Sequence, residues 1–146
     1  DLNRYLDILE KAFVIYRLQG FSRNLRKEVS KNPRYYFYDT GIRNALIQNF
    51  NALNLRDDLG ALWENYLVME RIKKQEYTGM SVANYFWRTY DKKEVDWLEE
   101  REGHLFAYEF KWNTAAKVVV PNDFMTAYPG TSFERVDSEN YLKFII

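Results

Sequence analysis

Residues 85–112 read YFWRTYDKKEVDWLEEREGHLFAYEFKW, and this stretch decides the fold that we expect for the chain. Aromatic and β-branched residues recur there in short runs, and two of the runs alternate apolar with polar residues, which is typical of half-buried strands. Polar turns at 91–93 and 101–103 separate the runs and predict tight connections. The expected strands are Tyr85–Tyr90, Glu94–Glu99 and Leu105–Trp112.

The middle strand is expected to have a polar face and a core face. Side chains two apart in a strand lie on one face, so Glu94 should share a face with Asp96. By the same alternation, Val95 and Trp97 should point the other way, toward a core. The middle strand therefore offers one surface on which charged groups can gather.

The third strand repeats this arrangement. Glu109 and Lys111 share its polar face, and its other face carries the aromatic residues Tyr108, Phe110 and Trp112. If the two strands pair as an antiparallel hairpin with their side chains in phase, Asp96, Glu109 and Lys111 project from one surface. Two carboxylates and an ammonium group then lie within a few ångströms of each other.

The composition limits the classes of function. The 146 residues are 47% hydrophobic and 18% aromatic, which suits a packed domain. The formal net charge is zero, so a nucleic-acid site must be a local basic patch. The lack of cysteine excludes disulfides and thiolate metal sites, and the single histidine, His104, excludes a multi-histidine centre. No apolar run is long enough for a membrane span or a signal sequence, so we expect no membrane partner.

The segment 1–56 has the element order of a small winged-helix module. Apolar residues at helical spacing predict an amphipathic helix over about the first thirteen residues. A strand over Phe13–Leu18, a polar loop and a second strand over Arg34–Tyr38 follow. The sequence starts at Asp1 without a methionine and inside the helix, so we expect it to be part of a longer protein.

A second helix is expected directly after this module. Asp39 with Thr40 is typical of a helix N-cap. The side of this helix that we expect to be buried carries Ile42, Ala45 and Leu46.

The loop between the two N-terminal strands is basic, with Glu28 as the one opposing charge before Asp39. Such a patch could touch nucleic-acid phosphates, and a solvated loop or a contact with a neighbouring module is the structural alternative. The candidate phosphate-contacting residues are Arg23, Arg26, Lys27 and Lys31.

The segment 57–146 opens with a longer helix from about Asp57 or Asp58 to about Lys74, before Gly79. Glu64 lies beside the apolar stripe of this helix, next to small or apolar residues one turn away on either side. A carboxylate on such a packed face is costly unless it is paired, hydrogen-bonded or protonated. We expect Glu64 to contact Lys111 directly or through one water, or to have a raised pKa if that contact is missing.

After the hairpin region the chain is expected to return to the sheet. Lys117–Val120 leads through Pro121 into a short helical segment that ends near Pro129. Two short strands should then follow, at Ser132–Val136 and Tyr141–Ile146.

With these residues in place, a family resemblance can be stated. Glu64 on a leading helix, Asp96 on a strand and Glu109-Phe110-Lys111 on the next strand resemble the signature of the PD-(D/E)xK nuclease-like superfamily. More closely, the chain resembles DUF4143, a domain of unknown function at the C-terminus of bacterial and archaeal AAA+ ATPases. The resemblance rests on RYYFYDTGIRNAL at 34–46, GALWENYLVMERI at 60–72, YFWRTYDKKEVDW at 85–97 and LFAYEFKW at 105–112.

The resemblance implies an α/β fold of the restriction-endonuclease-like type, a mixed sheet flanked by helices, over 57–146. It implies that residues 1–56 are a winged-helix-like remnant with a connecting helix. It also implies that an ATPase module precedes Asp1 and that the whole protein is cytoplasmic.

The same residues suit phosphodiester hydrolysis on chemical grounds. Asp96 and Glu109 could supply oxygen ligands for Mg²⁺ or Mn²⁺, and no organic cofactor is expected. Lys111 could orient the attacking water, and Glu64 could complete the site directly or through water. The structural alternative is a cross-strand charge cluster without catalysis. Two functions stay open: a metal-dependent nuclease, and an inactive module of the ATPase that binds nucleic acid or protein.

Overall fold

The hairpin stretch forms three strands in the computed structural model, which describes residues 1–23, 25–46 and 58–146. They are β3 (Ala83–Arg88), β4 (Glu94–Arg101) and β5 (His104–Phe110), and each pairs antiparallel with the next. The turn between β4 and β5 places Glu102 at φ 50° and Gly103 at φ 79°. Two consecutive positive φ values are what a two-residue hairpin turn needs to match the twist of its strands.

Strand β4 carries a β-bulge that changes which side chains share a face. Asp96 and Trp97 together lie opposite the single β3 residue Phe86. Val95 consequently packs in the core on one side of the sheet, and Trp97 packs in the core on the other side. The prediction that Val95 and Trp97 share a face is wrong, because the extra residue of a bulge interrupts the period-two alternation.

The N-terminal residues extend the same sheet. α1 (Leu2–Lys11) is the expected helix, and the strands that follow are β1 (Ile15–Gly20) and β2 (Arg34–Phe37). β1 pairs antiparallel with β2 and parallel with β3, and β6 (Ser132–Val136) pairs parallel with β5. The resulting order is β2-β1-β3-β4-β5-β6, a six-stranded mixed sheet flanked by helices, which confirms the expected fold class.

Helix α2 (Thr40–Leu46) begins where it was expected but does not bury the residues that were expected. Asp39 accepts hydrogen bonds through Oδ1 from the backbone N–H groups of Gly41 and Ile42, so it caps the helix. Ile42 is 43% exposed and Ala45 is exposed too, so their predicted burial is wrong. The half-buried side of α2 instead carries Arg43, whose Nη1 lies 2.9 Å from Asp58. The Leu46 side chain lies outside the described residues.

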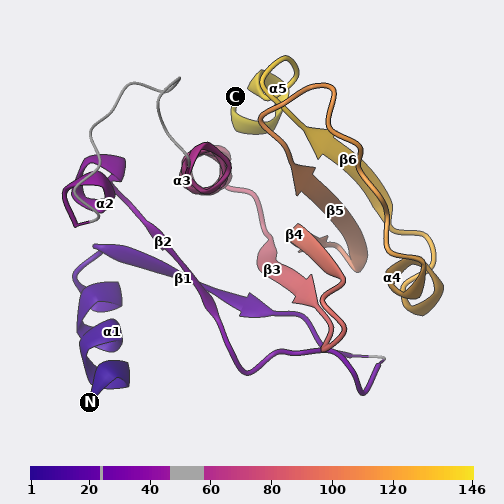
Figure 1. Cartoon of the computed structure of the whole chain (residues 1–146), viewed down its shortest axis with the longest axis horizontal. Helices are drawn as coiled ribbons and strands as arrows, with labels where there is room; N and C mark the ends of the chain where they lie inside the picture. The colour runs from indigo at the N-terminus through magenta and orange to yellow at the C-terminus, as the bar shows by residue number, and fades with distance from the viewer. Residues whose placement is uncertain (24, 47–57) are drawn as a thin grey trace.

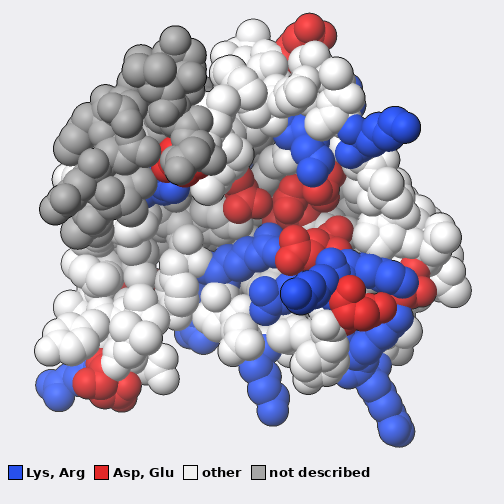
Figure 2. All heavy atoms as spheres, viewed as in Figure 1, with Lys and Arg blue, Asp and Glu red and all other residues white. Residues whose placement is uncertain are grey.

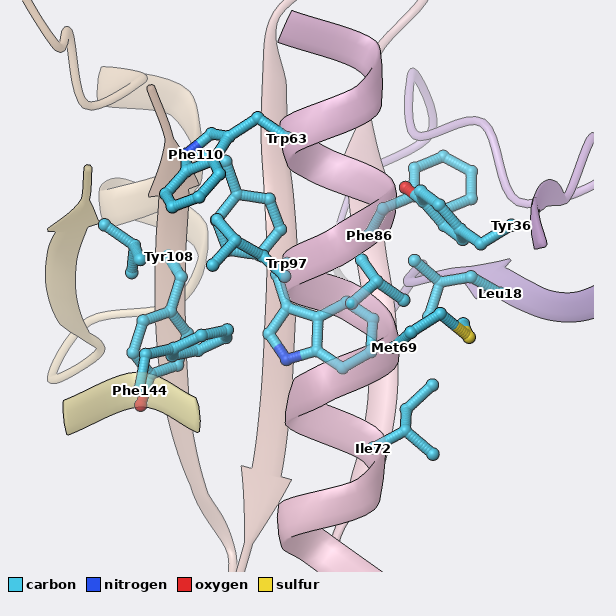
Figure 3. Packing of buried hydrophobic residues seen from close by; sticks show 13 residues of the cluster. Leu18, Tyr36, Trp63, Met69, Ile72, Phe86, Trp97, Tyr108, Phe110 and Phe144 are labelled. Carbon is cyan, nitrogen blue, oxygen red and sulfur yellow. The ribbon is translucent and has the colours of Figure 1, made fainter. Parts of the chain in front are cut away.

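Helix α3 (Leu59–Thr78) is the central helix of the domain, and the strands curve around it in Figure 1, where it is seen end-on. It runs one turn beyond the predicted end and stops at Gly79, whose φ of 65° suits a left-handed C-cap. Figure 3 shows α3 packed over the strands, with large side chains between helix and sheet. The buried residues of this cluster include Leu67 and Val68 of α3 and Trp97, Tyr108 and Phe110 of the strands.

The other side of the sheet is covered by α4 (Asn122–Ala127), whose Phe124 packs against Trp87. The predicted last strand is wrong, because its residues form the short helix α5 (Leu142–Ile145). Asp137 holds the turn before this helix, because its Oδ1 accepts hydrogen bonds from the backbone N–H groups of Glu139 and Asn140. Phe144 of α5 then packs on the strands from the α3 side. Among the described residues no helix is long and apolar enough to cross a membrane.

Candidate functional site

Two residues of α3, Trp63 and Asn65, attach the helix to β2 and to the end of β5. Trp63 donates from Nε1 to the carbonyl oxygen of Lys111, just beyond β5, at 3.1 Å. Asn65 makes two hydrogen bonds of 2.8 Å with the backbone of Phe37 in β2. The residue between them is Glu64, so its main chain is held between β2 and the end of β5. Glu64 is half-buried, and the charged groups that act on it come from β2 and β4.

Asp96 and Glu109 lie side by side at the open end of the β4–β5 hairpin. Asp96 accepts a hydrogen bond through Oδ2 from the backbone N–H of Phe110, at 2.9 Å. The carboxyl groups of Asp96 and Glu109 also act directly on each other, so ionising both at once is costly. Burial raises the pKa of both groups, and repulsion by Asp96 adds to the rise at Glu109. The pair therefore holds a proton more tightly than two separate carboxyl groups would.

Lys111 follows β5 directly and belongs to the same cluster. Its Nζ lies 3.7 Å from Oε1 of Glu109, and its charge also acts on Asp96. Its backbone N–H donates to the carbonyl oxygen of Val136 at 2.9 Å, which continues the pairing of β5 with β6. The structure thus brings Asp96, Glu109 and Lys111 together as the sequence predicts.

The direct contact predicted between Glu64 and Lys111 is wrong. No ion pair joins these two residues, both of which the structure describes, because Lys111 reaches along its own strand to Glu109. A raised pKa was expected for Glu64 if this contact is missing. That expectation is confirmed, because the pKa of Glu64 is raised to about 7. Burial is the main cause, and the negative charge of Asp96 adds to it.

The cation that faces Glu64 is Arg34, the first residue of β2. Its Nη2 lies 3.3 Å from Glu94 Oε1, and its Nη1 lies 4.0 Å from Asp96 Oδ1. Its guanidinium group is stacked 4.4 Å from the centre of the Phe86 ring. The sequence pattern placed Arg34 at the start of the second strand and assigned it no role in the site. Arg34 reaches the site because β1 pairs with β3 and β2 pairs with β1. This strand pairing cannot be predicted from the spacing of residues in the sequence.

Tyr36 is the second site residue that sequence analysis missed. It lies two residues after Arg34, on the same face of β2, and its side chain is buried. The hydroxyl group has no hydrogen bond of good geometry to a described residue. Burial and the nearby Glu64 carboxyl raise its pKa, so the phenol stays protonated. An aromatic residue in a predicted strand is usually a core residue, so the sequence does not single it out.

Two of the four predicted nucleic-acid residues are engaged within the domain. Arg23 donates from both Nη atoms to Glu100 of β4, and Lys27 pairs with Asp123 of α4. Arg26 and Lys31 are exposed and form no ion pair with the described residues. Carboxylates distant in the sequence therefore fold onto this loop and pair with two of its cations.

The donor set suits a hard divalent cation. Among the described residues no three Asp, Glu, His or Cys side chains are already placed to hold a metal. Mg²⁺ needs only one or two protein carboxylates, with water and phosphate oxygens completing its shell, so Asp96 and Glu109 are sufficient. Figure 2 shows acidic side chains gathered at the centre of one face, with basic side chains directly beside them.

Comparison with known proteins places the chain in a family. A model described as domain of unknown function, DUF4143, matches residues 59–139, more than half of the 146 residues. The chain belongs to the DUF4143 family. A second domain of unknown function, DUF8612, matches residues 1–54. The expected resemblance to DUF4143 is confirmed.

The curated relatives of this DUF4143 chain are longer than it is. Uncharacterized proteins of Mycobacterium tuberculosis and Mycobacterium bovis are each 31% identical to it over 112 residues. The match covers 74% of this chain but 24% of each relative, so the chain spans about a quarter of their length. No solved structure matches the chain.

The family boundaries divide the site. The DUF4143 match contains Glu64, Asp96 and Glu109, together with Lys111. Arg34 and Tyr36 lie in the segment that DUF8612 matches. The cluster therefore combines side chains from both matched segments in one sheet.

Proposed function

We propose that this DUF4143 chain hydrolyses phosphodiester bonds of nucleic acid with Mg²⁺ or Mn²⁺, at a site of the PD-(D/E)xK nuclease type. The observation that carries the proposal is the pairing of Asp96 with Glu109 at the end of one hairpin, with Lys111 3.7 Å from Glu109. Crowded carboxyl groups with raised pKa values are typical of sites that bind a cation. A purely structural ion pair would instead hold its carboxylate ionised.

In this proposal Asp96 and Glu109 hold the metal, which supplies Lewis-acid stabilisation of the charge that develops on the phosphate. Lys111 orients the attacking water or contacts the phosphate, since its ammonium group lies beside Glu109. The pKa of Glu64, about 7, suits it to accept or return a proton near neutral pH. Arg26 and Lys31 are the exposed basic residues of the loop that can meet the nucleic-acid backbone.

We further propose that the chain works with an AAA+ ATPase module of a longer cytoplasmic protein. The support is the resemblance to domains at the C-terminus of such ATPases, together with the greater length of the mycobacterial relatives. Nucleic acid would be the shared substrate, because the ATPase module can move it relative to the site.

A second candidate function is a module of the same ATPase that binds nucleic acid or protein without catalysis. One observation favours it: the described residues hold no ready group of three metal ligands. In this candidate the carboxyl cluster and its cations only fix the arrangement of β2, β4 and β5.

The test compares Lys111→Met with Lys117→Met, a matched change of an exposed lysine outside the cluster. Wild-type protein and Lys117→Met should cleave single-stranded or duplex DNA or RNA in Mn²⁺, whereas Lys111→Met should bind Mn²⁺ and not cleave. Calorimetry measures metal binding, and gel electrophoresis measures cleavage. Metal binding without cleavage by the wild type would favour the binding module. Failure to bind Mn²⁺ at millimolar concentration would contradict the nuclease proposal.

A further inference from the structure

We propose that Arg34 is an exchangeable counter-ion of the site. It neutralises carboxylates in the metal-free protein and contacts the phosphodiester backbone once a divalent cation takes over that neutralisation. This inference rests on the proposed function and adds a substrate-contacting residue from outside the DUF4143 segment.

The contacts of Arg34 are those of a loosely held cation. Its two Nη atoms reach two different carboxylates, at 3.3 Å and 4.0 Å. Arg71, on the same side of the sheet, donates from Nε and Nη2 to one carboxylate, that of Glu99, at 2.6 Å and 2.8 Å. The nearer partner of Arg34 is Glu94, whose side chain is 43% exposed, so water already competes for this contact.

The charges of the cluster explain why Arg34 would be released. The cluster holds the carboxyl groups of Glu64, Glu94, Asp96 and Glu109, and the charges of Arg34 and Lys111 both act on Asp96. A divalent cation at Asp96 and Glu109 adds two positive charges beside Arg34. The attraction between Arg34 and Asp96 is then replaced by repulsion from the cation. The guanidinium group becomes available to another anion.

The side chain of Arg34 can also move while strand β2 stays in place. Asn65 fixes Phe37 of β2 with hydrogen bonds of 2.8 Å in both directions, and Tyr36 is buried beneath α3. The Phe86 ring provides a flat surface for the guanidinium group at 4.4 Å. A phosphate is the fitting new partner, because its oxygens accept the paired N–H donors of a guanidinium group.

The test measures two affinities that should move in opposite directions. For Arg34→Gln, Mn²⁺ should bind about threefold or more tightly, because a competing positive charge is gone. The same variant with Ca²⁺ bound should bind a fluorescein-labelled DNA duplex about tenfold more weakly. Arg34→Lys keeps the positive charge but loses the paired N–H donors of the guanidinium group. Its Mn²⁺ affinity should therefore stay near that of the wild type, while its affinity for DNA falls. Titration calorimetry and fluorescence anisotropy give the two dissociation constants.

The matched control is Arg17→Gln, which removes an exposed arginine of the neighbouring strand β1 and should leave both affinities unchanged. Thermal melting of each variant checks that the fold is intact. If wild-type protein does not bind Mn²⁺, the proposed function fails and this inference fails with it. If the wild type binds Mn²⁺ but Arg34→Gln leaves either affinity unchanged, or weakens both, this inference alone is overturned.

Discussion

Two acidic side chains three residues apart on β4, Glu99 and Asp96, behave in opposite ways although both lie under α3. Burial opposes the ionisation of Glu99, but two hydrogen bonds from Arg71 outweigh it and lower its pKa. Trp97 and Gln75 also donate to Glu99, at 2.8 Å and 2.9 Å. Burial raises the pKa of Asp96, and its one backbone donor and two distant cations do not compensate.

This difference separates a structural carboxylate from one that is ready to bind a cation. Glu99 is fully buried, and its donors come from the helix and strand that it joins. Asp96 lies beside Glu109 and its charge acts on Glu64, so ionising all three carboxyl groups of the metal-free site is costly. Burial alone therefore does not predict the role of an acidic residue, whereas the set of its donors does.

The largest expected effect on stability comes from removing Arg71, the partner of Glu99. Arg71→Met should destabilise the protein by about 3–5 kcal/mol, because it leaves a buried charge without its partner. Urea unfolding measures the change. The double variant Arg71→Met with Glu99→Gln should recover most of the loss, since a neutral amide can still accept from Trp97. A single variant as stable as wild type would show that Glu99 is not held ionised by Arg71.

The next effect concerns Asp96. Asp96→Asn should remove the stabilisation by Mn²⁺, which for the wild type should reach about 2.7 kcal/mol at a hundred times the dissociation constant. Without metal its melting temperature should hold or rise, because one source of repulsion is gone. Glu102→Gln removes an exposed carboxylate from the turn of the same hairpin and should keep the metal effect. Loss of stability without metal would instead assign Asp96 to a structural ion pair.

A third prediction uses pH. The pKa of Glu64 is raised to about 7 and that of Glu109 to about 8, from an ordinary 4.5. The folded state binds these protons more tightly than the unfolded state, so this contribution to stability is complete below pH 4.5. It is lost as the pH rises through 7 and 8.

The unfolding free energy of the metal-free wild type should therefore fall between about pH 5 and about pH 9, and Glu109→Gln should reduce the fall. Urea unfolding at both pH values measures it, with Glu102→Gln as the control that keeps the wild-type slope. An unchanged slope in Glu109→Gln would mean that the Asp96–Glu109 pair does not retain a proton.

The smallest effect is expected at Glu100 of β4, which pairs with an exposed arginine. Its partner Arg23 has a side chain that is 50% exposed, so Arg23→Gln should cost less than about 1 kcal/mol. Arg26→Gln, an exposed arginine of the same loop, should cost nothing measurable. A loss from Arg23→Gln comparable with that from Arg71→Met would mean that exposure does not separate the two pairs.

Much of the site can be predicted from residues 85–112, because strand alternation and hairpin turns act over a few residues. The expected meeting of Asp96, Glu109 and Lys111 depends on one tight turn, with Gly103 at its centre. The bulge could not be predicted, since the pattern around Asp96 is compatible with a regular strand, and the cost of the bulge depends on what packs on each face.

The sequence pattern predicted most of the helices and strands around the hairpin, with α5 as an exception. It also predicted the N-cap Asp39, the helix-ending Gly79 and the meeting of two carboxylates with one lysine. These features follow from local geometry and short-range hydrogen bonding. Tertiary packing makes Arg34 rather than Lys111 the cation facing Glu64, and it lowers the pKa of Glu99 while that of Asp96 is raised. Both outcomes depend on distances between residues far apart in the chain, which the parallel pairing of β1 with β3 and the packing of α3 set.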